Sequence, residues 1–215
     1  MVHRNQIKEM RKANDVDQSI VDSLHSLIDA KQNLPGDVPQ KERDSFLMVF
    51  GGHILFQTLY SAVEFDLFTR LWESKQLSLS EICKQLEIQK QPARILLLGL
   101  VNIGLLNRSV DGIYSNTPTA DILLVKHSPK NLISYVKTQH HVMYRGMFHF
   151  HDSLKAFKNL GLEELEGNEP TLYQRLGHNP KVKQIFQDAM HELSEYANKD
   201  LAENVDFSDV KNLVD

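Results

Sequence analysis

The fold is decided by residues 78–117, which read SLSEICKQLEIQKQPARILLLGLVNIGLLNRSVDGIYSNT. Ser78 and Glu81 form a capping box, which predicts that a helix starts at this point. Pro92 suits the first position of a second helix, and Gly104 suits its C-terminal stop. An Asp-Gly turn between two short apolar pieces then predicts a hairpin. Helix, turn, helix and hairpin in this order predict a winged-helix unit.

The hairpin strands and the preceding segment extend this prediction. We expect the strands at residues 105–108 and 113–115, on either side of Val110-Asp111-Gly112. Residues 44–74 form a long helical stretch that is apolar on more than one face, which is typical of a buried core or an interface. Gly51-Gly52 lies inside it and is interpreted as a break or as a close contact between helices.

Prolines at the predicted first positions indicate where the helices after the hairpin begin. Thr117-Pro118 opens a short helix, and Ser128-Pro129 opens a long one over residues 129–158. Thr171 caps a short helix that Gly177 ends. Asn179-Pro180 opens a helix over residues 180–203, which carries a single apolar stripe. Ser128, Thr171 and Asn179 are therefore predicted to be caps. The stripe consists of Phe186, Met190, Leu193, Ala197 and Leu201.

Both ends of the chain show weaker patterns. Apolar residues recur at helical spacing over 20–28, and a strand is expected over 210–214. We therefore divide the chain into an N-terminal arm and helix (1–43), a winged-helix dimerisation domain (44–126) and linker helices that lead into a further domain (127–215). The predicted fold class is mainly α.

The composition favours an ordinary soluble globular protein. Hydrophobic residues make up 41% of the 215 residues, which is enough for a core. The formal net charge of -4 gives no basic excess for nucleic acid or an anionic membrane. Cys83 is the single cysteine, so no intrachain disulfide forms, and no apolar stretch reaches the ~20 uninterrupted residues of a membrane span. We expect a cytoplasmic protein with no nucleic-acid or membrane partner.

A winged helix raises the question of DNA binding. The second helix of the unit should then present polar and basic side chains to bases and phosphates. Arg94 and Asn102 are its only strongly polar members, because most of its surface is apolar. A DNA-binding regulator is therefore the less favoured alternative, and a buried, dimerising unit fits better.

Five segments in the same order resemble the caffeate/hydroxyindole O-methyltransferase family, and especially its bacterial small-molecule branch. Residues 62–68 resemble its A-x-E-L-G-L-F-D helix, with Phe65-Asp66 in place of Leu-Gly. The other segments resemble its winged helix, the Y-x-L-T-P end of the wing, its FNxAM motif and its YDFSGVxxLVD motif. They are residues 79–106, 114–118, 186–190 and 205–215.

This resemblance implies the N-terminal part of a class I methyltransferase that uses S-adenosylmethionine (SAM). In the family, LVD leads directly into a glycine-rich turn of a Rossmann-like domain that holds SAM. The ribose-binding acid and the general-base histidine also belong to that domain. This chain ends at Asp215, so no catalytic, cofactor-binding or metal-binding residue is assigned, and we expect no SAM binding by the chain alone.

By resemblance, the chain would dimerise and form one wall of a pocket for a small molecule. Methionines and aromatic residues suit flat ligands, because thioether and ring contacts adapt to their shape. Plain core packing is the competing interpretation for each residue. Metal binding is disfavoured for His140-His141 and for His149 with His151, because such spacings point to different helix faces. The candidate substrate-binding residues are Met143, Tyr144, Met147, Phe148, Phe186 and Met190.

The leading hypothesis is thus the dimerising and substrate-positioning part of an O-methyltransferase. Its substrate would carry a phenolic or polyketide-like hydroxyl, and its partner would be a second copy of the chain. The main alternative is a stand-alone, non-enzymatic dimerisation or regulatory module.

Overall fold

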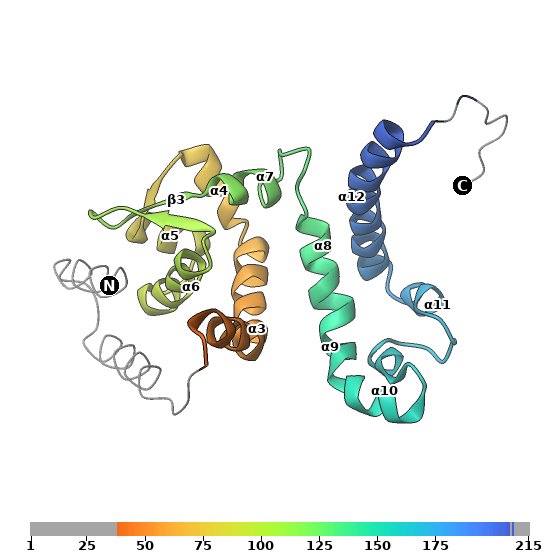
Figure 1. Cartoon of the computed structure of the whole chain (residues 1–215). Helices are drawn as coiled ribbons and strands as arrows, with labels where there is room; N and C mark the ends of the chain where they lie inside the picture. The colour runs from red at the N-terminus through yellow and green to blue at the C-terminus, as the bar shows by residue number, and fades with distance from the viewer. Residues whose placement is uncertain (1–37, 207, 209–215) are drawn as a thin grey trace. The chain divides into compact units, whose positions relative to one another are not determined.

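The computed structural model describes residues 38–206 and residue 208, and this part of the chain is mainly α-helical, as predicted (Figure 1). The chain divides into two compact units between Ala120 and Asp121, which we call unit 1 and unit 2. The predicted helix around residues 20–28 and the predicted strand at 210–214 lie outside the described residues.

Unit 1 combines helices with a small antiparallel sheet. The central strand is β3, which pairs with β1 on one side and with β2 on the other. Gly112 has φ of +79° at the hairpin turn between β2 and β3, a conformation that glycine adopts without steric cost. The elements are α3 (Gln40–Glu64), α4 (Leu67–Ser74), β1 (Leu77–Ser78), α5 (Leu79–Leu86), α6 (Lys90–Asn102), β2 (Leu106–Arg108) and β3 (Ile113–Asn116), followed by α7 (Pro118–Leu123) at the unit boundary.

The start and stop signals around α5 and α6 are largely confirmed. Ser78 and Glu81 form the complete capping box of α5. Gly104, with φ of +76°, follows the end of α6. Pro92 occupies the third position of α6 instead of the predicted first, because the helix already begins at Lys90. The position tolerates proline, since the first four N–H groups of a helix have no intrahelical acceptor.

The break in the long apolar stretch is at Asp66, not at the glycine pair. Helix α3 runs without interruption through Gly51-Gly52, so the break interpretation of this pair is wrong. The chain turns between α3 and α4 instead, where Asp66 has φ of +56°. Glycine and, less readily, Asp or Asn adopt this left-handed conformation. The resembled family motif has glycine at the position of Asp66, and this left-handed backbone conformation explains that choice.

The core of unit 1 lies between α4, α5, α6 and the sheet. Helix α3 joins it through its C-terminal half, where Ala62 and Val63 are buried. Gly99 of α6 lets α3 approach closely, because a Cβ at Gly99 would lie 2.8 Å from Cγ2 of Thr58. The largest fully buried side chains of this core are Leu67, Phe68, Leu71, Ile82, Leu97 and Leu100.

Unit 2 consists of helical segments joined by turns. The predicted continuous helix over 129–158 is wrong in two respects: it begins at Ile133, and it changes type along its length. Ser128 accordingly caps no helix; its hydroxyl donates to the carbonyl of Ile122, 2.6 Å away. The elements are α8 (Ile133–Thr138), a π-helix η1 (Gln139–Met143), α9 (Tyr144–Gly146), a 3-10 turn η2 (Met147–His149), α10 (Phe150–Ala156), a 3-10 turn η3 (Leu160–Glu164), α11 (Leu172–Leu176) and α12 (Pro180–Asn204).

The predicted caps of α11 and α12 are confirmed. The hydroxyl of Thr171 accepts from the backbone N–H of Gln174 at the start of α11, and Asn179 accepts from the N–H of Val182 at the start of α12. Gly177 ends α11, as its position in the sequence predicts.

Candidate functional site

The π-helix η1 divides the helical segment that carries most of the candidate substrate-binding residues. The N–H of Tyr144 donates to the carbonyl of Gln139, five residues earlier. The additional residue in this turn rotates the following side chains by about 100° relative to α8. Side chains after η1 therefore do not continue the buried face of α8, to which Val136 belongs. Such π-turns are frequent at functional sites.

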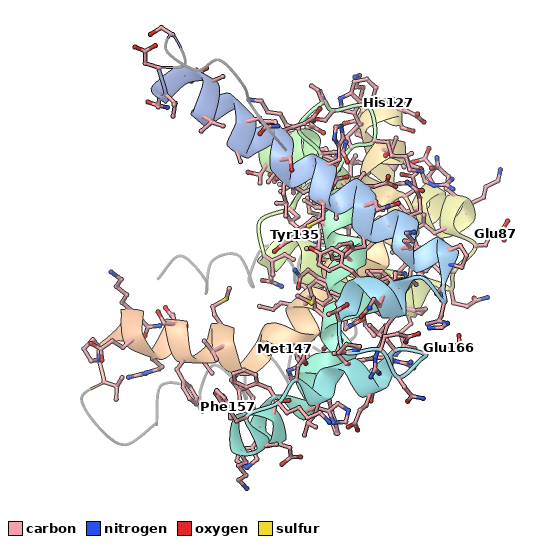
Figure 2. All side chains as sticks on the ribbon, turned by 90° about the vertical axis from the view of Figure 1, so that its right-hand side faces the viewer. Glu87, His127, Tyr135, Met147, Phe157 and Glu166 are labelled. Atoms are coloured by element: carbon pink, nitrogen blue, oxygen red, sulfur yellow. The ribbon has the colours of Figure 1, made fainter. Side chains whose placement is uncertain are left out.

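The six predicted site residues fall into two groups. Met143, Tyr144, Met147 and Phe148 are exposed, with Phe148 at 89%. Met147 and Phe157 lie at the same end of unit 2 (Figure 2). We call residues 143–148 the wall segment. Phe186 and Met190 belong to the second group and lie on α12.

Phe186 and Met190 lie in the core of unit 2. Phe186 is 8% exposed and packs with Val142 and Leu176, while the partly buried Met190 packs against this cluster. The ring of Phe186 also meets Tyr173 edge to face, with 5.6 Å between centroids. Phe186 and Met190 are therefore core residues, whereas the four side chains of the wall segment are exposed.

Helix α8 is fixed to α12 by polar contacts over a long sequence separation. The carboxylate of Glu192 accepts from the backbone N–H groups of Ser134 and Tyr135, at 3.0 and 2.9 Å. These N–H groups lie in the first turn of α8 and have no intrahelical acceptor, so Glu192 caps the helix from α12. One turn further along, the hydroxyl of Thr138 donates to the carbonyl of Ile185. The base of the wall segment is therefore tied to α12.

Two glycines, Gly146 in the wall segment and Gly161 in η3, allow the backbones of these two segments to approach closely. A Cβ on Gly161 would lie 2.8 Å from the carbonyl oxygen of Gly146 and 3.0 Å from its Cα. A Cβ on Gly146 would meet Gly161 only at 3.4 Å or more. Turn η3 and helix α9 thus pack backbone to backbone at this point.

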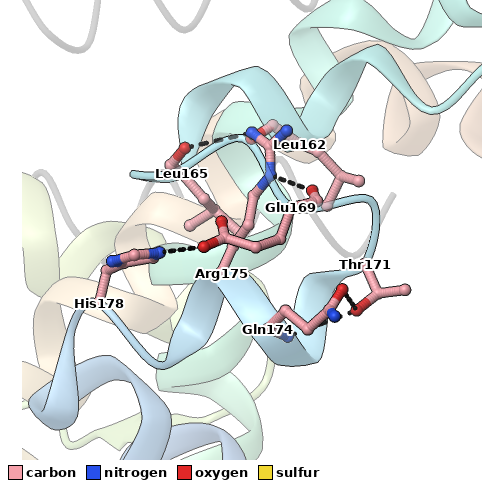
Figure 3. Close-up of polar contacts among 7 residues, drawn as sticks. All are labelled: Leu162, Leu165, Glu169, Thr171, Gln174, Arg175 and His178. Atoms are coloured by element: carbon pink, nitrogen blue, oxygen red, sulfur yellow. Dashed lines mark hydrogen bonds and ion pairs between the residues drawn. The ribbon is translucent and has the colours of Figure 1, made fainter.

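Arg175 holds the loop after η3 in place (Figure 3). Its Nε donates to the carbonyl of Glu169 at 2.7 Å, and its Nη1 donates to the carbonyls of Leu162 and Leu165 at 2.6 and 3.4 Å. The planar guanidinium suits this task, because its donors point in several fixed directions at once. We call residues 160–178 the brace.

Two histidine–carboxylate pairs complete the brace. His149 Nε2 lies 2.9 Å from Glu164, and His178 Nε2 lies 2.7 Å from Glu169. Two carboxylates of the acidic stretch 163–169 are thus paired with histidines. The pKa of Glu169 is lowered, first by its own backbone N–H and then by His178. The stabilisation linked to this lowered pKa is present above the usual carboxyl range and is lost on acidification.

Sequence reasoning missed the residues that support the wall segment. Arg175 and Glu192 carry no local motif, because their partners lie 6 to 13 and 57 to 58 residues away. A glycine inside a predicted helix, such as Gly146, was an available signal, since such glycines often have a packing reason. No group of three or more potential metal ligands occurs among the described residues.

Helix α6 offers little basic surface for DNA. Ile95 is exposed, and Arg94 is half-buried. Nucleic-acid binding requires a surface rich in basic side chains.

Comparison with known proteins assigns unit 1. Residues 47–126 match the family model described as the O-methyltransferase dimerisation domain. In this region the chain is therefore similar to the O-methyltransferase dimerisation domain. The matched region begins in α3 and extends through the sheet to the end of α7 and the turn that follows it.

Two curated relatives are bacterial methyltransferases. The L-tyrosine C(3)-methyltransferase of Streptomyces lavendulae is 31% identical over 174 residues, which are 81% of this chain and 47% of the relative. The tetracenomycin polyketide synthesis 8-O-methyl transferase TcmO of Streptomyces glaucescens is 39% identical over 103 residues, which are 48% of this chain and 28% of the relative. The chain therefore spans at most about half the length of these relatives.

Solved structures agree with this assignment. The apo form of the S-adenosylmethionine-dependent methyltransferase SibL matches with a TM-score of 0.67 at 30% identity, over 76% of this chain and 48% of SibL. Human N-acetylserotonin methyltransferase, solved in complex with SAM, matches with a TM-score of 0.72 over 81% of this chain and 52% of its own. Its 21% identity supports the shared fold. The chain spans about half the length of these two solved structures.

Proposed function

We propose that this chain is the dimerising and substrate-positioning part of a SAM-dependent methyltransferase that acts on a small-molecule hydroxyl of phenolic or polyketide-like type. The observation that carries the proposal is the wall segment. It exposes Met143, Tyr144, Met147 and Phe148 at and after the end of a π-helix, while Phe186 and Met190 pack with Val142, the residue that precedes it. The matched dimerisation domain supports self-association, and we propose a homodimer.

The described residues do not fit SAM. Its binding in this type of enzyme uses a glycine-rich turn between a strand and a helix N-terminus. Among the described residues, the sheet is antiparallel and small, and the adjacent glycines Gly51-Gly52 lie inside α3. We therefore assign to this chain the positioning of substrate and the exclusion of water, and no step that involves the cofactor.

Calorimetry with SAM tests this division of roles. Titration of SAM into the 215-residue chain is expected to give no binding heat at micromolar concentrations, because the described residues contain no glycine-rich turn between a strand and a helix. A full-length relative serves as the positive control. Micromolar affinity of this chain for SAM would contradict the proposal that it supplies only dimerisation and substrate contacts.

Methyl NMR tests the substrate wall directly. With 13C-labelled methionine and phenol as the probe ligand, the methyl signals of Met143 and Met147 are expected to shift. Ring currents of a stacked aromatic ligand act on nearby thioether methyl groups, and methionine surfaces adapt to flat rings. The signal of Met48 on α3 provides an internal reference, because Met48 is not one of the six candidate substrate-binding residues.

Matched variants make the phenol experiment specific. Phe148→Ala should reduce the shifts at least severalfold, while Phe157→Ala, which removes an equally exposed ring outside the wall segment, should leave them unchanged. If phenol moves Met48 as much as Met147, or moves neither, the wall segment is not a binding surface for aromatic hydroxyl compounds.

Methylation of carbon is the second candidate reaction. One relative is named for transfer to C(3) of L-tyrosine and another for transfer to an oxygen. A phenol can accept a methyl group at its oxygen or at the neighbouring ring carbon, so the same wall suits both. We retain the O-methyltransferase as the first candidate, because the family model that matches this chain is named for it.

We also propose a cytoplasmic location and the division into residues 1–43, 44–126 and 127–215. A stand-alone regulatory module remains the alternative function. It would dimerise as proposed but leave phenol unbound, so the NMR experiment separates the two.

A further inference from the structure

One stretch of α3, residues 46–50, is apolar and exposed around the whole circumference of the helix. Residues 46–50 are five consecutive apolar side chains, and successive residues of a helix point about 100° apart. All five are exposed, with Phe50 at 71% and Val49 at 82%. The exposed apolar surface extends to Ile54. An apolar helix of this kind is usually buried in a core or an interface.

The glycine pair within this exposed surface has no contact that explains it. A Cβ at Gly51 or Gly52 would meet no atom of the described residues within 4 Å. Two glycines weaken a helix, so a structural reason for them is expected. Elsewhere in the described chain, helical Gly99 and Gly146 lie against a side chain or a backbone that approaches closely. The pair at 51 and 52 leaves the same kind of room for a neighbour outside the described residues.

The direction of that neighbour follows from the helix geometry. Gly51 precedes Thr58 by seven residues, two turns of helix, so both lie on one face of α3. Thr58 packs on Gly99 of α6. Along its C-terminal half this face is thus covered by α6, and along its N-terminal half no described residue takes the place of α6.

We propose that the neighbour is α3 of a second copy, and that the two helices cross at Gly51-Gly52. This inference rests on the proposed homodimer and specifies its contact. The dimerisation-domain match begins at residue 47 and so includes most of the exposed surface. In a two-fold dimer the same patch meets itself, and an apolar patch is complementary to itself. The missing Cβ atoms let the two backbones approach closely at the crossing.

A lipid bilayer suits this surface less well than a second copy. Helix α3 is long and apolar enough to span a membrane by length and composition alone. Its C-terminal half, however, packs against α4 and α6 in unit 1. The exposed part, residues 46–54, is about 14 Å long, roughly half of the ~30 Å hydrocarbon core.

The glycine crossing is tested by adding bulk without harming the helix. Gly52→Leu introduces a strong helix former, so the helix content of the monomer is preserved. We expect the dimer dissociation constant, measured by analytical ultracentrifugation, to rise at least about tenfold, because the side chain separates the backbones. Lys41→Leu is the matched control; it adds the same side chain on α3, about 16 Å from the crossing, and should leave the constant unchanged.

Cysteine cross-linking gives an independent readout. In a Cys83→Ala background, Gly52→Cys should form a disulfide between copies under mild oxidation, because such a bond needs Cα atoms within about 7 Å. Lys41→Cys should cross-link at least about tenfold more slowly, since the helices diverge away from the crossing. Addition of phosphatidylcholine vesicles should change neither rate.

The outcomes separate the two levels of the argument. A wild-type chain that stays monomeric at high micromolar concentration would overturn the homodimer itself. A wild-type dimer that tolerates Gly52→Leu and gives no disulfide at position 52 would overturn only the α3 crossing. Residues 1–37, a different face of the chain or, if α3 binds the vesicles, lipid would then cover this surface.

Discussion

Gly161→Val is expected to destabilise unit 2 by about 3 kcal/mol and to lower its Tm by roughly 10 °C. Even the first side-chain atom at this position would lie 2.8 Å from the carbonyl oxygen of Gly146, and that neighbour is backbone, which does not move aside as a flexible side chain does. The wall segment and the brace would separate at the crossing. Circular dichroism followed during heating measures the change.

The same crossing offers its own control. In Gly146→Ala, the new Cβ meets Gly161 only at 3.4 Å or more, and alanine improves the helix in which Gly146 lies. We expect its Tm to stay within a few degrees of the wild-type value. Equal losses for Gly146→Ala and Gly161→Ala, or none for Gly161→Val, would show that η3 and α9 do not approach as closely as described.

The elements that sequence reasoning placed well depend on neighbours within a few residues. The capping box at Ser78, the left-handed Gly104 and the cap at Asn179 each satisfy backbone groups one turn away. These local hydrogen bonds are kept in the folded chain, because no tertiary contact replaces them, so the sequence patterns predict them reliably. The family resemblance is carried by such segments in a fixed order, and residues 47–126 match the O-methyltransferase dimerisation model.

The errors arise where distant contacts decide the local structure. Ser128-Pro129 was expected to open a helix, yet α8 begins at Ile133, where the carboxylate of Glu192 supplies the cap. Apolar periodicity also cannot reveal a π-turn, because the additional residue at 139–143 changes the period within a single turn.

The same limit applies to the candidate site. Its methionines and aromatic residues were found by type, but the sequence did not separate exposed Met147 and Phe148 from buried Phe186. The stripe on α12 looked uniform, yet only its first half is covered in the described structure: Phe186 is buried, and Leu193 and Leu201 are exposed. Burial depends on where α8 and α11 pack, which is not encoded in the stripe itself.

Arg175→Met is expected to release the brace. Methionine approximates the length of the arginine side chain but donates no hydrogen bond, so the carbonyls of Leu162, Leu165 and Glu169 lose their shared donor. Hydrogen bonds from a charged donor typically contribute ~1.5–3 kcal/mol each, and the loop carbonyls regain water, so we expect a net loss of about 3 kcal/mol. Amide exchange over residues 160–169 should accelerate at least about tenfold.

The contacts of the brace indicate which other amides should exchange faster in Arg175→Met. The wall segment contacts η3 through Gly146 and Gly161, and His149 next to the segment pairs with Glu164, so amides of 143–149 should also lose protection. Arg145→Met is the matched control: Arg145 is exposed on α9, and its loss should leave exchange unchanged. Arg175→Lys should rescue only part of the effect, because one ammonium cannot reproduce the spread of the guanidinium donors. Unchanged exchange over 143–149 in Arg175→Met would show that the brace and the wall segment are not coupled.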